Sequence, residues 1–176
     1  LNKVEDVAGL KLRVIPNPIN VAWVKALGAN PTPLPFPEVY SALEQGAIDG
    51  QENPVSVIAA SKFWEVQKHI ALTNHQYNPQ TVMFSKKVWD TLSATEKKII
   101  DDSAHEATGV QRQQSRAALA ANLELLKKNG MTVTQFPPAE VAKLREKMKP
   151  VIAQFSANVG DATVNEVTAA LTQLRK

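Results

Sequence analysis

The chain has 176 residues, of which 44% are hydrophobic and 21% charged, a composition that predicts one globular domain, or one domain and part of a second. The net charge of +3 is a small excess spread along the chain, which argues against a nucleic-acid-binding protein. The absence of cysteine excludes disulfides, thiolate catalysis and cysteine-bound zinc. No apolar run approaches the roughly 20 residues that a membrane-spanning helix needs.

The first part of the chain predicts strands that alternate with helices. Residues 9–15 alternate apolar and basic side chains, which is typical of a strand. An amphipathic helix is expected between the cap residue Asn17 and Gly28. The proline-rich residues 31–36 are expected to be extended, and a second helix follows at 37–45.

The segment 43–54 is the most informative part of the chain. A strand is expected at 47–51, and Asn53 followed by Pro54 is the usual order of a helix cap and a first helical residue. Polar side chains at a strand-to-helix junction lie where open α/β sheets bind ligands. The segment therefore predicts a binding site before it indicates the kind of ligand.

The rest of the chain is dominated by one long helix. A capping box at Ser93–Glu96 begins it, and it is expected to run to Lys128, about 50 Å at 1.5 Å per residue. That length exceeds a small domain, so the helix is expected to bridge two lobes. The strand–helix order predicts an α/β fold with parallel strands. Further strands are expected at 69–73, 81–84 and 131–136, and further helices at 138–148 and 164–174.

Catalytic and metal-binding motifs are absent from the sequence. It contains no metal-binding histidine pair, no serine-nucleophile motif and no phosphate-binding glycine loop. Asp49, Glu52 and His75 are the side chains that an enzyme could use, although turn and structural roles explain them as well. Asp101 and Asp102 fall in the first turns of the long helix, where negative charge favours the helix dipole.

Three side chains remain as candidates for ligand binding. Arg13 lies near the end of its strand, and its guanidinium can bind a carboxylate with two parallel hydrogen bonds. Asn53 offers a donor and an acceptor, and Phe36 could form an apolar wall. The pattern alone leaves simpler alternatives open: a solvated strand residue for Arg13, a helix cap for Asn53 and a core residue for Phe36.

Six ordered blocks of sequence resemble the substrate-binding proteins of TRAP transporters, the tripartite ATP-independent periplasmic transporters. The similarity is to the C4-dicarboxylate-binding branch, including proteins of the type that bind sialic acid and uronates, and it covers essentially the whole chain. The blocks are residues 9–14, 26–31, 35–40, 49–54, 62–68 and 72–75.

The resemblance implies two α/β lobes that close over a small organic acid. This chain would be one periplasmic-binding-protein-like lobe, with a parallel-rich sheet flanked by helices and a long lobe-spanning helix. Residues 1–78 and 117–176 would form this second lobe, and 79–116 would cross into the first. Family members are longer, so most of the first lobe and a signal peptide are expected in an N-terminal part that this sequence lacks.

The resemblance also assigns the ligand contacts. It implies that Arg13 pairs with the ligand carboxylate, that Asn53 bonds the ligand and that Phe36 packs against the ligand body, with Asn17 as a weaker candidate. It implies no catalysis, no cofactor and no metal. A sugar acid such as a uronate fits Phe36 and Asn53 better than a bare C4-dicarboxylate, which remains the alternative.

The function implied is that of a periplasmic binding protein that delivers its solute to TRAP membrane permease subunits. A ligand-sensing domain of a signalling receptor is an alternative from another class, and an enzyme is a third. Without the first lobe, the segment 79–116 should expose apolar side chains and cause self-association or binding to the N-terminal half. These side chains are Val82, Phe84, Val88 and Trp89.

Overall fold

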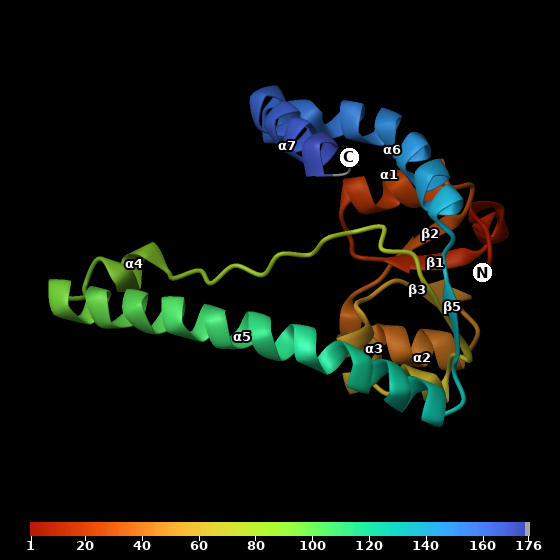
Figure 1. Ribbon diagram of the computed structural model, residues 1–176, viewed down its shortest axis with the longest axis horizontal. Helices are drawn as coiled ribbons and strands as arrows, with labels where there is room; N and C mark the ends of the chain where they lie inside the picture. Colours follow the sequence, from red (N-terminus) through yellow and green to blue (C-terminus); the bar gives the residue numbers. More distant parts are fainter. Residues whose placement is uncertain (175–176) are drawn as a thin grey trace.

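The computed structural model describes residues 1–174, which form two parallel sheets with helices on their faces (Figure 1). The elements before the long helix are η1 (Val4–Val7), β1 (Lys11–Val14), α1 (Pro18–Ala26), β2 (Asn30–Pro33), η2 (Phe36–Glu38), α2 (Val39–Glu44), β3 (Gly50–Gln51), α3 (Val55–Ala60), η3 (Phe63–Glu65), β4 (His69–Leu72) and α4 (Lys86–Trp89). They are followed by α5 (Ala94–Lys128), β5 (Thr132–Gln135), α6 (Pro138–Val159) and α7 (Asp161–Leu174).

The first sheet has the order β2-β1-β3, and all of its strands are parallel, as the strand–helix order predicts. Residues 31–36 were expected to be extended, and Asn30–Pro33 of this region form the strand β2. Prolines are tolerated there because β2 is an edge strand, where a missing N–H leaves no unfilled bond in the ladder. β3 is only Gly50–Gln51, shorter than the expected strand 47–51.

The second sheet joins strands that are far apart in the chain. β4 pairs in parallel with β5, with Leu72 opposite Gln135. Between them the chain leaves the sheet, reaches α4 and returns along α5, so that both form an arm beyond the sheets (Figure 1). The strand predicted at 81–84 is wrong: these residues have no strand partner in the part of the chain that the structure describes.

The first sheet separates two apolar layers. On one side, β1 packs against α1 through Val14, Val24 and Ala29. On the other side, α2, α3 and the last turns of α5 enclose a larger cluster around the fully buried Phe63 and Leu126. Leu126 therefore anchors the C-terminal end of α5, whereas the other end of that helix extends away from the sheets (Figure 1).

The helix predicted at 138–148 continues to Val159 as α6, although Pro150 lies inside it. A proline in a helix removes one backbone hydrogen bond and disfavours the helical conformation before it. Val151, the next residue, is 7% exposed and lies beside α1. We attribute the continuation to this packing, which offsets the lost bond.

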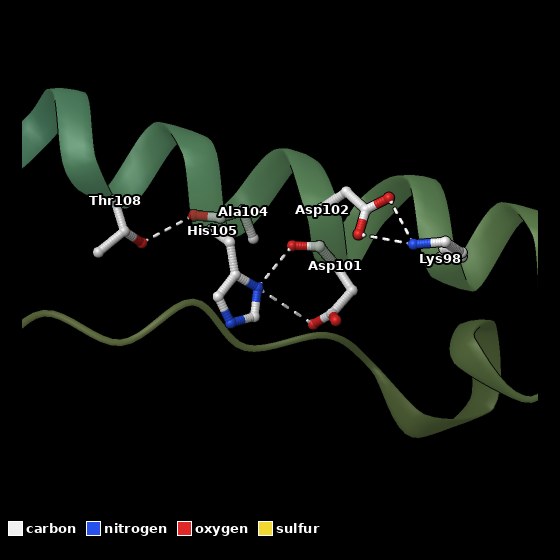
Figure 2. A network of polar contacts seen from close by, with 6 residues as sticks. All are labelled: Lys98, Asp101, Asp102, Ala104, His105 and Thr108. Atoms are coloured by element: carbon white, nitrogen blue, oxygen red, sulfur yellow. Dashed lines mark hydrogen bonds and ion pairs between the residues drawn. The ribbon is translucent and has the colours of Figure 1, made fainter.

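The N-terminal end of α5 forms as predicted. Ser93 Oγ accepts a hydrogen bond from Glu96 N at 3.2 Å, and Glu96 Oε2 accepts one from Ser93 N at 2.8 Å. Lys98 binds Asp102 at 2.9 Å, and His105 Nδ1 lies 3.6 Å from Asp101 (Figure 2). These side chains are exposed, so they form surface pairs along the helix. Over residues 1–174 no helix is both long and apolar enough to cross a membrane.

Candidate functional site

Arg13 is the third residue of β1, and only 3% of its surface is exposed. Its Nε donates a hydrogen bond to the carbonyl oxygen of Leu34, at 2.8 Å. The alternative of a solvated strand residue is therefore wrong. Burial lowers the pKa of Arg13, and the charge of nearby Glu52 partly opposes this shift. Because arginine titrates far above neutral pH, the guanidinium remains charged.

The charge of Arg13 has no close carboxylate partner. Within residues 1–174, no carboxylate oxygen lies within 4.0 Å of its guanidinium. The guanidinium lies over the ring of Phe36, whose centroid is 5.9 Å from Arg13 Cζ. A cation over an aromatic ring is attracted to the negative face of the ring. The site therefore combines a buried cation with an aromatic surface.

Phe36 is 42% exposed, so it is not the core residue that the simpler alternative required. Its ring lies 6.1 Å from the ring of Phe63, which is 2% exposed and belongs to the core. The core thus supports Phe36 from one side. The remaining exposed surface of the ring is available to a flat or apolar part of another molecule.

Asn53 follows β3, and its side chain does not cap α3, so the cap alternative is also wrong. Its Nδ2 donates to Gln51 Oε1 at 2.6 Å, and Gln51 Nε2 donates to Gln67 Oε1 at 3.0 Å. Gln51 and Gln67, which complete these hydrogen bonds, were not among the candidate site residues expected from the sequence. A polar residue in a short strand was the signal for Gln51, and no signal was available for Gln67.

The carboxylates considered for catalysis have separate partners. Asp49 accepts from the backbone N–H of Lys11 at 2.8 Å, at the start of β1. Glu52 follows β3 in the chain, whereas Asp49 precedes it, and Glu52 Oε2 is 3.6 Å from His75 Nε2. His75 also contacts Trp23, with ring centroids 5.2 Å apart. Glu52 and His75 thus connect the chain after β4 to the site, and Asp49 does not join them.

Asn17 is not part of this cluster. Its Oδ1 accepts from the backbone N–H of Ile19 at 3.0 Å and caps α1. It borders a groove of about 790 Å³ between α1 and α6, whose lining does not include Arg13, Phe36 or Asn53. In the described residues 1–174, no group of three or more histidine or acidic side chains could hold a metal ion.

The comparison with known families identifies the chain. Residues 1–158 match the family described as bacterial extracellular solute-binding protein, family 7. The chain belongs to the family 7 solute-binding proteins. Because this is a family of binding proteins and not of enzymes, the expectation of a non-catalytic protein and the resemblance to TRAP-transporter binding proteins are both confirmed.

Several known binding proteins match nearly all of this chain. The sialic acid-binding periplasmic protein SiaP of Vibrio cholerae serotype O1 is 40% identical over 169 residues, which are 96% of this chain and 52% of the relative. A TRAP periplasmic solute-binding protein from Ochrobactrum anthropi, solved with the C-terminus bound in the ligand-binding pocket, is 50% identical. The match covers 99% of this chain and 55% of the Ochrobactrum chain, with a TM-score of 0.87.

A further solved structure that is similar to this chain is the sugar acid-binding protein DctPAm of Advenella mimigardefordensis, in complex with galactonate. It is 40% identical with a TM-score of 0.92, and the match covers 98% of this chain and 56% of that one. These matches confirm the α/β binding-protein fold. The chain spans about half the length of the relatives that it matches.

Proposed function

We propose that this chain forms the ligand-binding second lobe of the periplasmic component of a TRAP transporter, and that Arg13 binds the carboxylate of a small organic acid. The support is the buried guanidinium, which Leu34 O orients and which has no carboxylate partner in residues 1–174. A buried charge without a partner is costly, and a ligand carboxylate would offset that cost. Phe36 would then pack against the ligand body.

The ligand class that fits best is a sugar acid such as a uronate. The site brings carboxamides, an aromatic ring and the nearby carboxylate of Glu52 to Arg13, and in the described part of the chain no second cation is bonded to the carboxamides. Carboxamides suit hydroxyls, whereas a C4-dicarboxylate has a second charge to neutralise. The Vibrio and Advenella relatives, named for sialic acid and solved with galactonate, also handle acids that carry hydroxyls.

The test is calorimetric titration of the intact protein with galactonate, galacturonate and succinate. We expect the two sugar acids to bind and succinate to bind more weakly. Arg13→Ala should weaken binding of the acids strongly while the protein stays folded. Binding of succinate alone would replace the sugar-acid assignment with the C4-dicarboxylate alternative, and unchanged binding by Arg13→Ala would remove Arg13 from the site.

The same proposal places the protein in the periplasm, directed there by a signal peptide, with TRAP membrane permease subunits as its partners. Residues 1–78 and 117–176 would form the second lobe, and 79–116 would belong to the first. The projecting arm of α4 and the N-terminal part of α5 supports this division (Figure 1). Fractionation of cells that express the intact protein tests the location.

We also propose that the arm, together with the segment that leads into α4, is covered either by the remaining part of a longer chain or by a second copy of this one. Val82 is 76% exposed, Phe84 49% and Val88 51%. Trp89 is half-buried, because its ring contacts Phe84 with the centroids 5.6 Å apart. Exposed apolar side chains that are close together in the sequence, as these are, favour an interface.

A further inference from the structure

Three carboxamide side chains from different segments form a continuous hydrogen-bonded chain. Asn53 lies before α3, Gln51 is in β3 and Gln67 lies between η3 and β4. Asn53 Nδ2 donates to Gln51 Oε1 at 2.6 Å, and Gln51 Nε2 donates to Gln67 Oε1 at 3.0 Å. All three residues are half-buried, so water competes less for these bonds than at an exposed position.

The chain of bonds has a direction. Each donor is an amide nitrogen and each acceptor an amide oxygen, so that Gln67 Oε1 is the final acceptor. For Asn53 this uses one of the two N–H groups. Within residues 1–174, Asn53 Oδ1 makes no hydrogen bond, and the oxygen is left as an acceptor together with one N–H.

This oriented carboxamide lies next to the buried cation. Gln51 is the register partner of Arg13 on the neighbouring parallel strand. Paired residues of adjacent strands direct their side chains to the same face of a sheet. Asn53 is therefore held, through Gln51, on the face that carries Arg13.

We infer that Gln51 and Gln67 are positioning residues that fix the carboxamide of Asn53, so that its Oδ1 accepts a hydrogen bond from the hydroxyl beside the ligand carboxylate. This inference rests on the proposed function, in which Arg13 binds the carboxylate. It narrows the ligand class to 2-hydroxy acids of the sugar-acid type. A 2-deoxy acid leaves Asn53 Oδ1 without its donor and binds more weakly.

The experiment compares galactonate with 2-deoxygalactonate by calorimetry on the intact protein. We expect the protein to prefer galactonate by about tenfold, the effect of about one hydrogen bond in a site shielded from water. Gln67→Met removes the final acceptor and should reduce this preference to below about threefold. Gln67→Glu keeps an acceptor oxygen at the same place and should retain the preference.

The ratio of the two affinities is the decisive quantity. Both acids carry one negative charge, so any repulsion by the new carboxylate in Gln67→Glu cancels in the ratio. A merely structural role of Gln67 would lower the melting temperature and leave the ratio unchanged. A ratio unchanged in Gln67→Met overturns the inference, and a ratio lost equally in Gln67→Glu and Gln67→Met overturns the direction of the bonds.

Two further outcomes separate this inference from the proposed function. Arg13→Ala should weaken both acids, so unaltered binding by that variant contradicts the proposed function and the inference with it. Normal binding of both acids with equal affinity contradicts only the inference.

The Asn53 side-chain amide signals in a ¹⁵N–¹H spectrum give a measurement without ligand. These signals should shift in Gln67→Met but not in the distant variant Lys149→Met.

Discussion

Arg13 and Gln51 are register partners on the neighbouring parallel strands β1 and β3. A buried guanidinium and the middle carboxamide of the hydrogen-bonded chain thus share one face of the sheet. A shift of one residue in a strand would move every side chain to the opposite face. The pairing of only Leu12 with Gly50 and Arg13 with Gln51 therefore assembles the candidate site.

Replacement of Arg13 should weaken acid binding far more than it changes stability. Removal of one partner of a buried charge pair costs about 2–5 kcal/mol of binding free energy, so Arg13→Ala should lower galactonate affinity by that amount. Arg13→Lys should recover little, because an ammonium lacks the planar fork. Lys11→Ala is the matched control, since Lys11 lies on the same strand but is exposed. Equal effects at both positions in calorimetry would contradict this assignment.

The neighbouring rings of Phe36 and Phe63 should respond in opposite ways. Phe63 is 2% exposed, so Phe63→Ala should cost about 3–5 kcal/mol of unfolding free energy. Phe36 is 42% exposed and lies over Arg13, so Phe36→Ala should cost about 1 kcal/mol of binding free energy. Urea unfolding and calorimetry measure the two quantities. Equal destabilisation by both substitutions would place Phe36 in the core.

The capping box should stabilise the first turn of α5 locally. Ser93→Ala removes the side-chain acceptor of Glu96 N and should cost about 1 kcal/mol of local helix stability. Hydrogen exchange of the amides at 94–97 should speed up, because this turn lies at the far end of the arm (Figure 1). Ser93→Thr retains the hydroxyl and serves as the control. Slow exchange maintained in Ser93→Ala would mean that other contacts hold the turn.

Glu140 should make the stability depend on pH. Lys143 Nζ at 2.7 Å and the backbone N–H of Val4 at 2.8 Å lower the pKa of Glu140 from its usual value of 4.5. Because the folded pKa is the lower one, the stabilisation is complete above the unfolded value and disappears as the pH falls through the folded value. Glu140→Gln should therefore lower the melting temperature more at pH 7 than at pH 3.

The control for this prediction is a carboxylate on the same helix without a bond to η1. Among the described residues 1–174, Glu146 forms an ion pair only with Lys149, on the surface, so Glu146→Gln should change the melting temperature little at either pH. A constant difference between Glu140→Gln and the unsubstituted protein across this pH range would show that the charge of Glu140 does not stabilise the fold.

The exposed arm should make the 176-residue chain self-associate. Val82→Asp combined with Phe84→Asp should reduce the association, because a charge opposes burial of these side chains. Ile152→Asp is the control, since Ile152 is 50% exposed on α6, outside the arm. Sedimentation velocity over a range of concentrations measures the effect. A monomer at all concentrations would exclude self-association through the arm.

Local signals in the sequence predicted most of the elements. The cap at Asn17, the turn at Gly28 with φ +85° and the capping box at Ser93 each act within a few residues. Long-range pairing was not predictable in the same way. The parallel pairing of β4 with β5 joins residues 72 and 135, and the segment 81–84 failed as a strand because nothing pairs with it in the described chain.

The residues of the candidate site could be proposed from the sequence, but their contacts could not. The resemblance pointed to Arg13, Phe36 and Asn53, whereas strand alternation gave Arg13 the same exposure as Lys11. The structure separates the two because the turn that carries Leu34 and Phe36 covers Arg13 alone. Gln67 could not be foreseen, since its contact with Gln51 depends on how η3 and β4 pack against the first sheet.

The anchoring of α5 at Leu126 makes the helix a lever. Its 35 residues extend about 50 Å, so a tilt of about 10° at the buried end moves the other end by about 9 Å. Angular changes too small to disturb the packing of Leu126 would thus produce large displacements at α4. A small change in packing near the sheets would therefore appear as a large movement at the end of α5 beside α4.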